Sequence, residues 1–120
     1  MALKKAGLTR FRQEIGQAVD RGVETAAGYV ADLERQLAPY DPNADHKHLN
    51  ESIEVRGAKG SRKRQVVAGV GLPDPRAIIQ EYGSVDQPAQ PYATPAAEAI
   101  DVKIEVQKEI QALVRKARSA

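Results

Sequence analysis

One apolar pattern in the first third of the chain constrains the fold more than any other feature. Between Leu8 and Leu37, apolar residues recur about 3.6 positions apart on average, which is the period of an α-helix. They are Leu8, Phe11, Ile15, Val19, Val23, Ala26, Val30, Leu33 and Leu37. Pro39 must stop this helix, because its ring clashes with the preceding turn. The pattern predicts one long amphipathic helix over residues 8–38, with Thr9 as the cap of a slightly later start.

The next part of the chain predicts a small antiparallel sheet. Turn-forming residues at 40–45 separate the helix from two apolar segments, 52–56 and 65–72, and a basic loop with glycines joins these segments. We therefore expect a β-hairpin over residues 52–72 with a long tip. A two-stranded sheet is marginal by itself, so the long helix is expected to cover it.

Two more helices are expected, each with a polar cap followed by proline. Asp74-Pro75 would begin a short helix over 74–82 that Gly83 terminates, and Thr94-Pro95 would begin a helix over 95–117. The last helix is apolar on two sides, because Ile100 and Ile104 lie off its main stripe. That stripe is formed by Ala99, Val102, Val106, Ile110, Leu113 and Ala117. Since a surface helix needs one stripe, the second side should meet another element or another chain.

A proline-rich segment over 83–94, which we call the strap, joins these two helices. Proline fixes φ, removes a backbone donor and pushes the preceding residue toward extended geometry. The residues expected to be extended for this reason are Gln87, Gln90 and Thr94. A stiff segment with Tyr82 and Tyr92 offers large contact area at low entropic cost, which favours a docking surface. The alternative is a buried connection between two elements.

Composition sets the class of protein. A chain of 120 residues fits one domain, and 42% hydrophobic content with many Ala and 4% aromatic residues predicts a thin core. Such helices often complete their burial against a neighbouring subunit. The net charge of +2 does not by itself argue for nucleic acid. The absence of Cys excludes disulfides and thiolate metal sites, and no apolar run approaches the roughly 18 residues of a membrane span, so a soluble chain is expected.

No set of residues suggests catalysis, so we expect neither an enzyme nor a cofactor. His46 and His48 could ligate a metal with Asp41 and Asp45 nearby, but a third committed ligand type is missing and exposed turn histidines are the simpler interpretation. Glu81 is interpreted as structural, because its carboxylate could accept backbone donors of the turn after Gly83.

The hairpin tip is the one charge cluster for which the sequence suggests a function, namely contact with nucleic-acid phosphates. Its cations are Lys59, Arg62, Lys63 and Arg64. A single such loop binds phosphate weakly, but repeated around a ring it would line a channel with positive charge for passing DNA. A solvated hairpin tip is the alternative.

The order of four short motif boxes resembles a known family. The boxes are Leu49-Asn50-Glu51-Ser52-Ile53, Glu81-Tyr82-Gly83-Ser84, Pro88-Ala89-Gln90-Pro91-Tyr92 and Thr94-Pro95-Ala96. Their order and spacing resemble the tail-component family of long-tailed bacteriophages, which includes neck and tail-completion proteins similar in role to the minor tail protein Z of phage lambda. Ser84 replaces the commoner Thr and Tyr92 the commoner Phe.

Taken together, the expected elements predict an α+β fold in a single domain, with the N-terminal and C-terminal helices packed on the small sheet. The resemblance implies a non-enzymatic ring of six copies at the head–tail junction of the virion, assembled in the host cytoplasm, with an axial path for DNA. Its partners would be itself and the neighbouring neck, connector and tail-tube proteins. The expected subunit or neighbour contacts are Tyr82, Gly83, Pro88, Pro91, Tyr92, Pro95, Ile100 and Ile104. The alternatives are a tail terminator or head-side stopper of the same neck, and a small nucleic-acid-binding protein that uses the basic loop.

Overall fold

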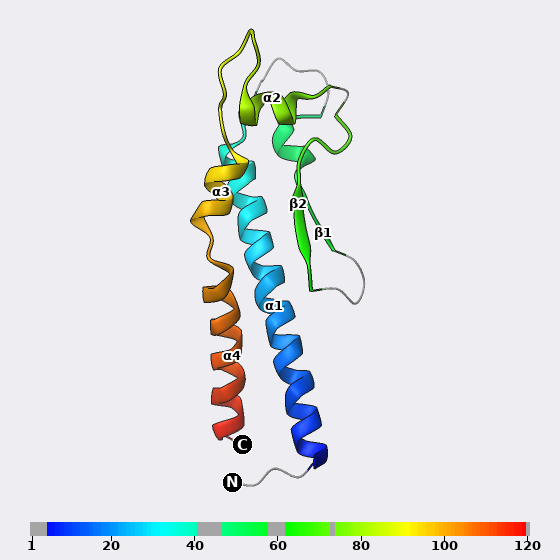
Figure 1. The fold of residues 1–120 in the computed structure, drawn as a ribbon, viewed down its shortest axis with the longest axis vertical. Coiled ribbons are helices and arrows are strands. Elements are labelled where there is room, and N and C mark those ends of the chain that lie inside the picture. The colour runs from blue at the N-terminus through cyan, green and yellow to red at the C-terminus, as the bar shows by residue number, and fades with distance from the viewer. Residues whose placement is uncertain (1–4, 41–46, 58–61, 73, 120) are drawn as a thin grey trace. The chain divides into compact units, whose positions relative to one another are not determined.

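The computed structural model describes residues 5–40, 47–57, 62–72 and 74–119, and it has the predicted α+β class (Figure 1). The chain divides into two compact units, residues 1–26 with 101–120 and residues 27–100. We call the first the helix-pair unit and the second the hairpin unit. The sequence predicted one domain, whereas the structure divides the chain within its first helix, so that each unit contains part of that helix.

The long helix α1 (Lys5–Leu37) confirms the apolar pattern and ends before Pro39 as predicted. It begins before Thr9, so Thr9 is not its cap. Its most buried positions are small residues, Ala18, Gly22, Ala26 and Ala31, together with Glu34. The larger apolar side chains are only partly covered, and Leu8 and Leu37 are exposed. Small residues let neighbouring backbones approach closely, which is how a chain with few aromatic residues builds its core.

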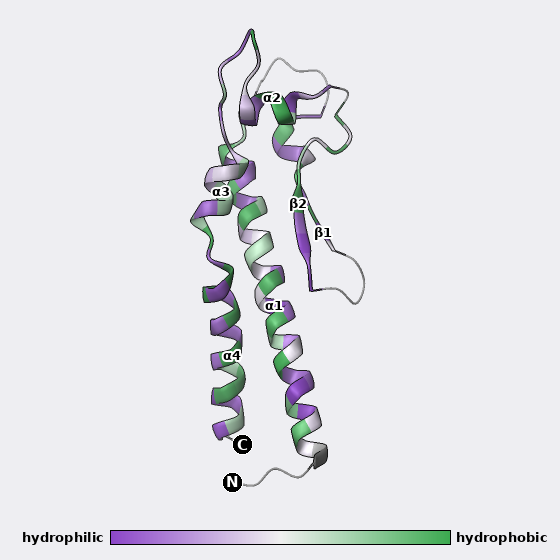
Figure 2. Ribbon diagram, in the orientation of Figure 1, coloured by the Kyte–Doolittle hydropathy of each residue, from purple (hydrophilic) through white to green (hydrophobic). Residues whose placement is uncertain are grey.

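In the helix-pair unit, α4 (Val102–Ser119) packs against the first part of α1. A Cβ atom on Gly22 would lie 2.6 Å from the Cα of Val106, so the two backbones meet at this glycine. Arg21 Nε lies 3.2 Å from Glu109 Oε2. Figure 2 shows apolar residues along both helices. Within this unit, the contacts of α4 are with α1.

The predicted helix over 95–117 is two helices, α3 (Ala93–Ala99) and α4. Ile100 between them is extended, with φ −109° and ψ 123°. Asp101 then caps α4, because its carboxylate accepts a hydrogen bond from the backbone N of Lys103 at 3.0 Å and its carbonyl accepts one from Ile104. The apolar spacing continues across this break, and for that reason it predicted one continuous helix.

The hairpin is shorter than predicted. Strands β1 (Glu54–Gly57) and β2 (Arg64–Val67) are antiparallel, with Val55 opposite Val66. A 3₁₀ helix, η1 (Leu49–Ser52), precedes β1. The core of the hairpin unit contains Ala31, Ala38, Leu49, Ile53 and Tyr92, with Val66, Ala68, Leu72, Ala77 and Ala93 packed against it. The second half of α1 therefore helps to cover the hairpin, as expected.

The short helix α2 (Arg76–Tyr82) precedes the strap. Asp74 Oδ1 accepts a hydrogen bond from the backbone N of Arg76, as expected of a residue at a helix start, although the helix begins one residue after Pro75. Gly83 ends α2 as predicted. Its φ is +81° and its N–H donates to the carbonyl of Ile79 at 2.7 Å. A side chain at Gly83 would also meet the backbone of Ala89 at 2.9 Å, so the tight return of the strap requires glycine.

Candidate interaction surface around the strap

The side chain of Glu81 ties the two ends of the strap together. Its Oε2 accepts hydrogen bonds from the backbone N–H groups of Tyr92 and Ala93, each at 2.8 Å, and its Oε1 accepts from Thr94 N at 3.0 Å and from the Thr94 hydroxyl. These are donors of the first turn of α3, which otherwise have no intrahelical partner. Glu81 thus caps α3 from a different helix, and we call these four residues the Glu81 clasp.

The clasp keeps Glu81 ionised. Burial raises the pKa of this carboxyl, but the hydrogen bonds from the Thr94 hydroxyl and three backbone N–H groups outweigh burial and lower the pKa to about 2. A carboxylate with four donors is occupied, so it is not available as a catalytic base. The sequence predicted this structural role, but it expected the donors to come from the turn after Gly83 rather than from α3.

A second carboxyl, that of Glu34 on α1, is buried in the same unit with only 3% of the residue exposed. Burial and then the charge of Glu81 raise the pKa of Glu34 to about 7, while Arg35 opposes this shift. The pKa of Tyr92 rises to about 12, because of burial and the charges of Glu34, Glu81 and Tyr82. The two carboxyl groups therefore differ in charge over a wide pH range, and the interior of this unit becomes sensitive to pH near neutrality.

Tyr92 belongs to the core, which corrects its prediction as a neighbour contact. The residue is 2% exposed, and its hydroxyl donates to the carbonyl of Ala77 at 3.0 Å. With few aromatic residues available, the fold uses this ring to fill the space beside Leu49 and Ile53. The expectation that Thr94 is extended is also wrong, because Thr94 lies in the first turn of α3.

The surface that remains open is an apolar ridge, which we define as Ile78, Tyr82 and Val85. Ile78 is 65% exposed, Tyr82 is 77% exposed and Val85 is fully exposed. Ile78 and Tyr82 are four positions apart on α2, so they share a face. Among the predicted contacts, the exposed ones are Tyr82, Pro88, Pro91, Pro95 and Ile104, and the partly buried ones are Gly83 and Ile100. Sequence reasoning missed Ile78 and Val85, although their spacing from Tyr82 was the signal.

The motif boxes meet in this unit. Ser52 from the first box donates its hydroxyl proton to the Leu49 carbonyl and accepts the backbone N–H of Gly69 at 2.9 Å. Leu49 and Ile53 of that box lie in one buried cluster with Tyr92 of the third box. Glu81 of the second box joins Tyr92 to Thr94 of the fourth. All four boxes therefore contribute to one connected structure.

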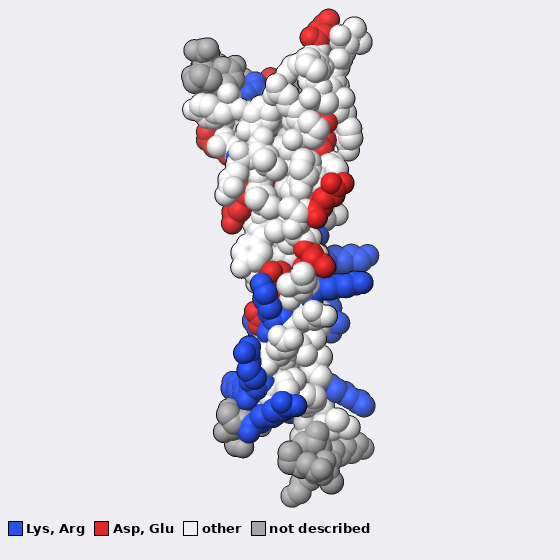
Figure 3. Space-filling model, turned by 90° about the vertical axis from the view of Figure 1, so that its left-hand side faces the viewer, with Lys and Arg blue, Asp and Glu red and all other residues white. Residues whose placement is uncertain are grey.

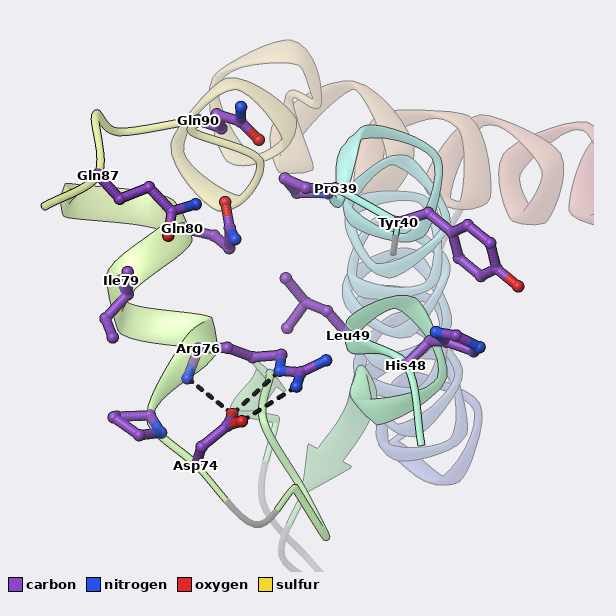
Figure 4. Close-up of a pocket in the computed structure, with 11 residues that line it drawn as sticks. Pro39, Tyr40, His48, Leu49, Asp74, Arg76, Ile79, Gln80, Gln87 and Gln90 are labelled. Atoms are coloured by element: carbon purple, nitrogen blue, oxygen red, sulfur yellow. Dashed lines mark hydrogen bonds and ion pairs between the residues drawn. The ribbon is translucent and has the colours of Figure 1, made fainter. Parts of the chain in front are cut away.

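A hollow of about 510 Å³ opens beside the strap (Figure 4). One wall comes from α2 and the strap, with Gln80, Gln87 and Gln90, and the other comes from Pro39, Tyr40, His48 and Leu49. The guanidinium of Arg76 in this hollow is bound by Asp74, with Nε to Oδ1 at 3.0 Å. The lining is thus mainly amide and apolar, with the charge of Arg76 compensated.

Of the four candidate metal ligands, the structure describes only His48. The ring of His48 lies against Tyr40, with centroids 4.3 Å apart. His46, Asp41 and Asp45 lie outside the described residues. Within the described part of the chain, no group of three His, Cys, Asp or Glu side chains could hold a metal ion.

Two groups of basic side chains, at the hairpin tip and in the helix-pair unit, bear on nucleic-acid contact. At the hairpin tip, Arg62 and Lys63 are exposed, Arg64 is half-buried at the start of β2, and Lys59 lies outside the described residues. The sequence of the helix-pair unit has ten Lys and Arg against six Asp and Glu. Figure 3 shows the cationic side chains along this unit. Sequence analysis considered only the loop and missed the charge of the helix pair, since the pair forms from the two ends of the chain.

No protein-family model, curated protein or solved structure matches this chain. Over the described residues, no helix combines the length and apolar character that crossing a bilayer requires. The family resemblance therefore depends on the four boxes alone.

Proposed function

We propose that this protein is a structural component of the head–tail junction of a long-tailed bacteriophage, a ring-forming tail-completion or neck protein. The observation that carries the proposal is the convergence of the four motif boxes on one core and one clasp. Here Glu81 needs the donors of Tyr92 to Thr94, and Tyr92 needs the cluster with Leu49 and Ile53.

The geometry favours a structural role over an enzymatic one. Glu81 is occupied by four hydrogen bonds, and Glu34 is buried beneath the surface. What the hairpin unit offers to other molecules is an apolar ridge beside a fixed strap. Ridges of this kind are typical of protein–protein contact, because large apolar side chains gain most from being covered.

In the proposed particle, six copies surround the tail axis and contact the neighbouring connector and tail-tube proteins. A ring requires two different patches on each copy, so that one patch meets the other on the next copy. Positive side chains, either Arg62 and Lys63 at the hairpin tip or those of the helix pair, would then face the DNA path. The protein would assemble in the host cytoplasm and remain in the virion.

Deleting the coding sequence from the phage tests this proposal. We expect full heads and finished tails that fail to join, and adding the purified chain to an extract should restore joined particles. Tails of uncontrolled length would instead identify a tail terminator, and heads that lose their DNA would identify a head-side stopper. Normal infectious particles would refute a neck function.

A nucleic-acid-binding protein is the remaining alternative. It predicts that the isolated chain binds duplex DNA with a steep salt dependence, and that replacing Arg62, Lys63 and Arg64 by Gln abolishes the binding. The neck proposal predicts weak binding by the isolated chain, because a few phosphate contacts per copy become significant only in a ring.

A further inference from the structure

We propose that one end of the helix-pair unit, where the start of α1 and the end of α4 lie side by side, binds the phosphates of DNA. This inference rests on the proposed function, and it assigns the contact with the passing DNA to the helix pair rather than to the hairpin tip. We call this surface the basic end. Its side chains are Arg10, Arg12, Arg115, Lys116 and Arg118.

The packing of the two helices brings distant parts of the sequence together at this end. Arg21 Nε lies 3.2 Å from Glu109 Oε2, and a hollow along the pair is lined by Glu14 of α1 and Lys116 of α4, among others. The residue numbers fall along α1 as they rise along α4, so the two helices are antiparallel. The first turns of α1 therefore lie beside the last turns of α4, and Figure 1 shows them at the same end of the unit.

Charge is divided along the helix-pair unit. The sequence has four Lys and Arg in residues 1–13 and three in residues 110–120, with no Asp or Glu in either range. All six acidic residues of the unit lie in the remaining ranges, 14–26 and 101–109. The five side chains of the basic end are exposed, and Figure 3 shows cationic side chains gathered in this unit. Arg10 also pairs with Glu14 at 3.4 Å, but a pair this exposed is weak. A surface with one sign of charge raises the local concentration of a polyanion.

Arg115 and Arg118 form the centre of this surface. They are three positions apart on α4, so they share a face, and both line a hollow of about 300 Å³ with Ile110, Gln111 and Val114. Neither arginine has an acidic partner among the described residues. A guanidinium can donate two parallel hydrogen bonds to one phosphate, and the amide of Gln111 adds a further donor. The hollow therefore offers a phosphate group donors from three side chains.

The other properties of this end favour a nucleic acid over a membrane. Four of its five cations are arginines, which match the geometry of a phosphate better than lysine does. Helices that lie in a membrane surface insert several large apolar side chains. Among the described residues at this end, Leu8 is the one large apolar side chain that is exposed, at 39%. A phosphate backbone is therefore the polyanion that this surface fits best.

The salt dependence of binding tests this assignment, because each phosphate contact lowers the slope of log affinity against log salt by about 0.9. Five contacts predict a slope of about −4.5, so the affinity for duplex DNA should fall roughly 500-fold between about 50 and 200 mM salt. The two exposed cations among the described residues of the hairpin tip, Arg62 and Lys63, would give a slope of about −2. Near physiological salt, the affinity of a single copy stays weak, as the neck function predicts.

The chain is titrated onto a fluorescent DNA duplex, and binding is followed by fluorescence anisotropy at several salt concentrations. The double variant Arg115→Gln with Arg118→Gln should weaken binding at least about tenfold at about 50 mM salt and make the slope less steep by about 2. Arg10→Gln with Arg12→Gln should have the same effect, since the surface needs both helices. Arg115→Lys with Arg118→Lys should keep the slope, because the charges remain. The matched control, Arg62→Gln with Lys63→Gln, removes the same charge at the hairpin tip and should change the affinity less than about twofold.

The outcomes separate the inference from the proposed function. A slope that neither helix-pair variant changes, or a loss of binding in the hairpin-tip variant alone, would overturn the DNA contact of the basic end. Equal or tighter binding to polyglutamate with the same number of charges would identify an acidic protein as the partner and would also overturn it. The same holds for equal or tighter binding to phosphatidylglycerol vesicles, which would identify a membrane. All these results leave the neck function standing, whereas joined, infectious particles without this chain would refute the neck function itself.

Discussion

Replacing Glu34 by Gln should stabilise the protein at pH 8 and change little at pH 4.5. The pKa of Glu34 is raised from an ordinary value of 4.5 to about 7. Between these values the folded chain holds a proton that the unfolded chain has lost, so stability falls as pH rises through this window. Each unit of pKa difference between the folded and unfolded chain corresponds to about 1.4 kcal/mol. Ionised Glu34 therefore lowers the free energy of unfolding by about 3 kcal/mol above pH 7. Gln keeps the size of the side chain and removes this cost.

The measurement is urea unfolding, followed by circular dichroism, at several pH values from 4.5 to 8. Glu24→Gln is the matched control, because Glu24 is an exposed glutamate on the same helix. We expect the advantage of the Glu34→Gln variant to grow from near zero to about 3 kcal/mol across this range. An advantage that does not change with pH would refute the argument that a buried, titrating carboxyl lies at this position.

Five further substitutions test the other parts of the structure. Glu81→Gln should lower the free energy of unfolding by about 3 kcal/mol at pH 7. The loss should shrink as the pH falls from 4.5 toward 2, because a carboxylate with a lowered pKa contributes stability only while it is ionised. Equal stability of the two proteins at pH 7 would contradict the clasp. Gly22→Ala should lower the stability of the protein by roughly 1–3 kcal/mol, because the added Cβ meets the backbone of α4. Gly28→Ala, whose added Cβ has nothing within 4 Å, should raise the stability by up to about 1 kcal/mol. Thermal unfolding measures both changes. Tyr92→Ala should cost about 3–5 kcal/mol of folding stability, while Tyr82→Ala should change stability by less than about 0.5 kcal/mol and weaken assembly; a similar loss of stability in both would contradict the assignment of Tyr82 to the surface.

Local rules account for the features that the sequence predicted. The long helix follows from its apolar period, its end follows from Pro39, and the end of α2 follows from Gly83. Each of these depends on residues within one or two turns of one another. The α+β class follows because the hairpin and the helices each have such a local signature.

Features that depend on distant residues were not predictable in the same way. The clasp joins Glu81 to residues eleven to thirteen positions away, and no local pattern specifies that pairing. The burial of Tyr92 follows from it, because the clasp draws the end of the strap into the core. The break at Ile100 was missed for a different reason, since the apolar period continues through it and only the cap at Asp101 marks it.

The sequence predicted only part of the candidate surface. Tyr82, predicted as a contact residue of the proline-rich segment, is the last residue of α2 and is exposed. Ile78 on α2 and Val85 in the strap have the apolar character of core residues, and the structure shows that both are exposed.

Electron cryomicroscopy of the head–tail junction tests the central claim most directly. Joined particles should show a closed ring of this chain around the tail axis, with Tyr82 of each copy covered by a neighbouring copy and Tyr92 inside its own fold. The account would be contradicted if the junction lacked this chain, or if its copies lay apart with the ridge open to solvent.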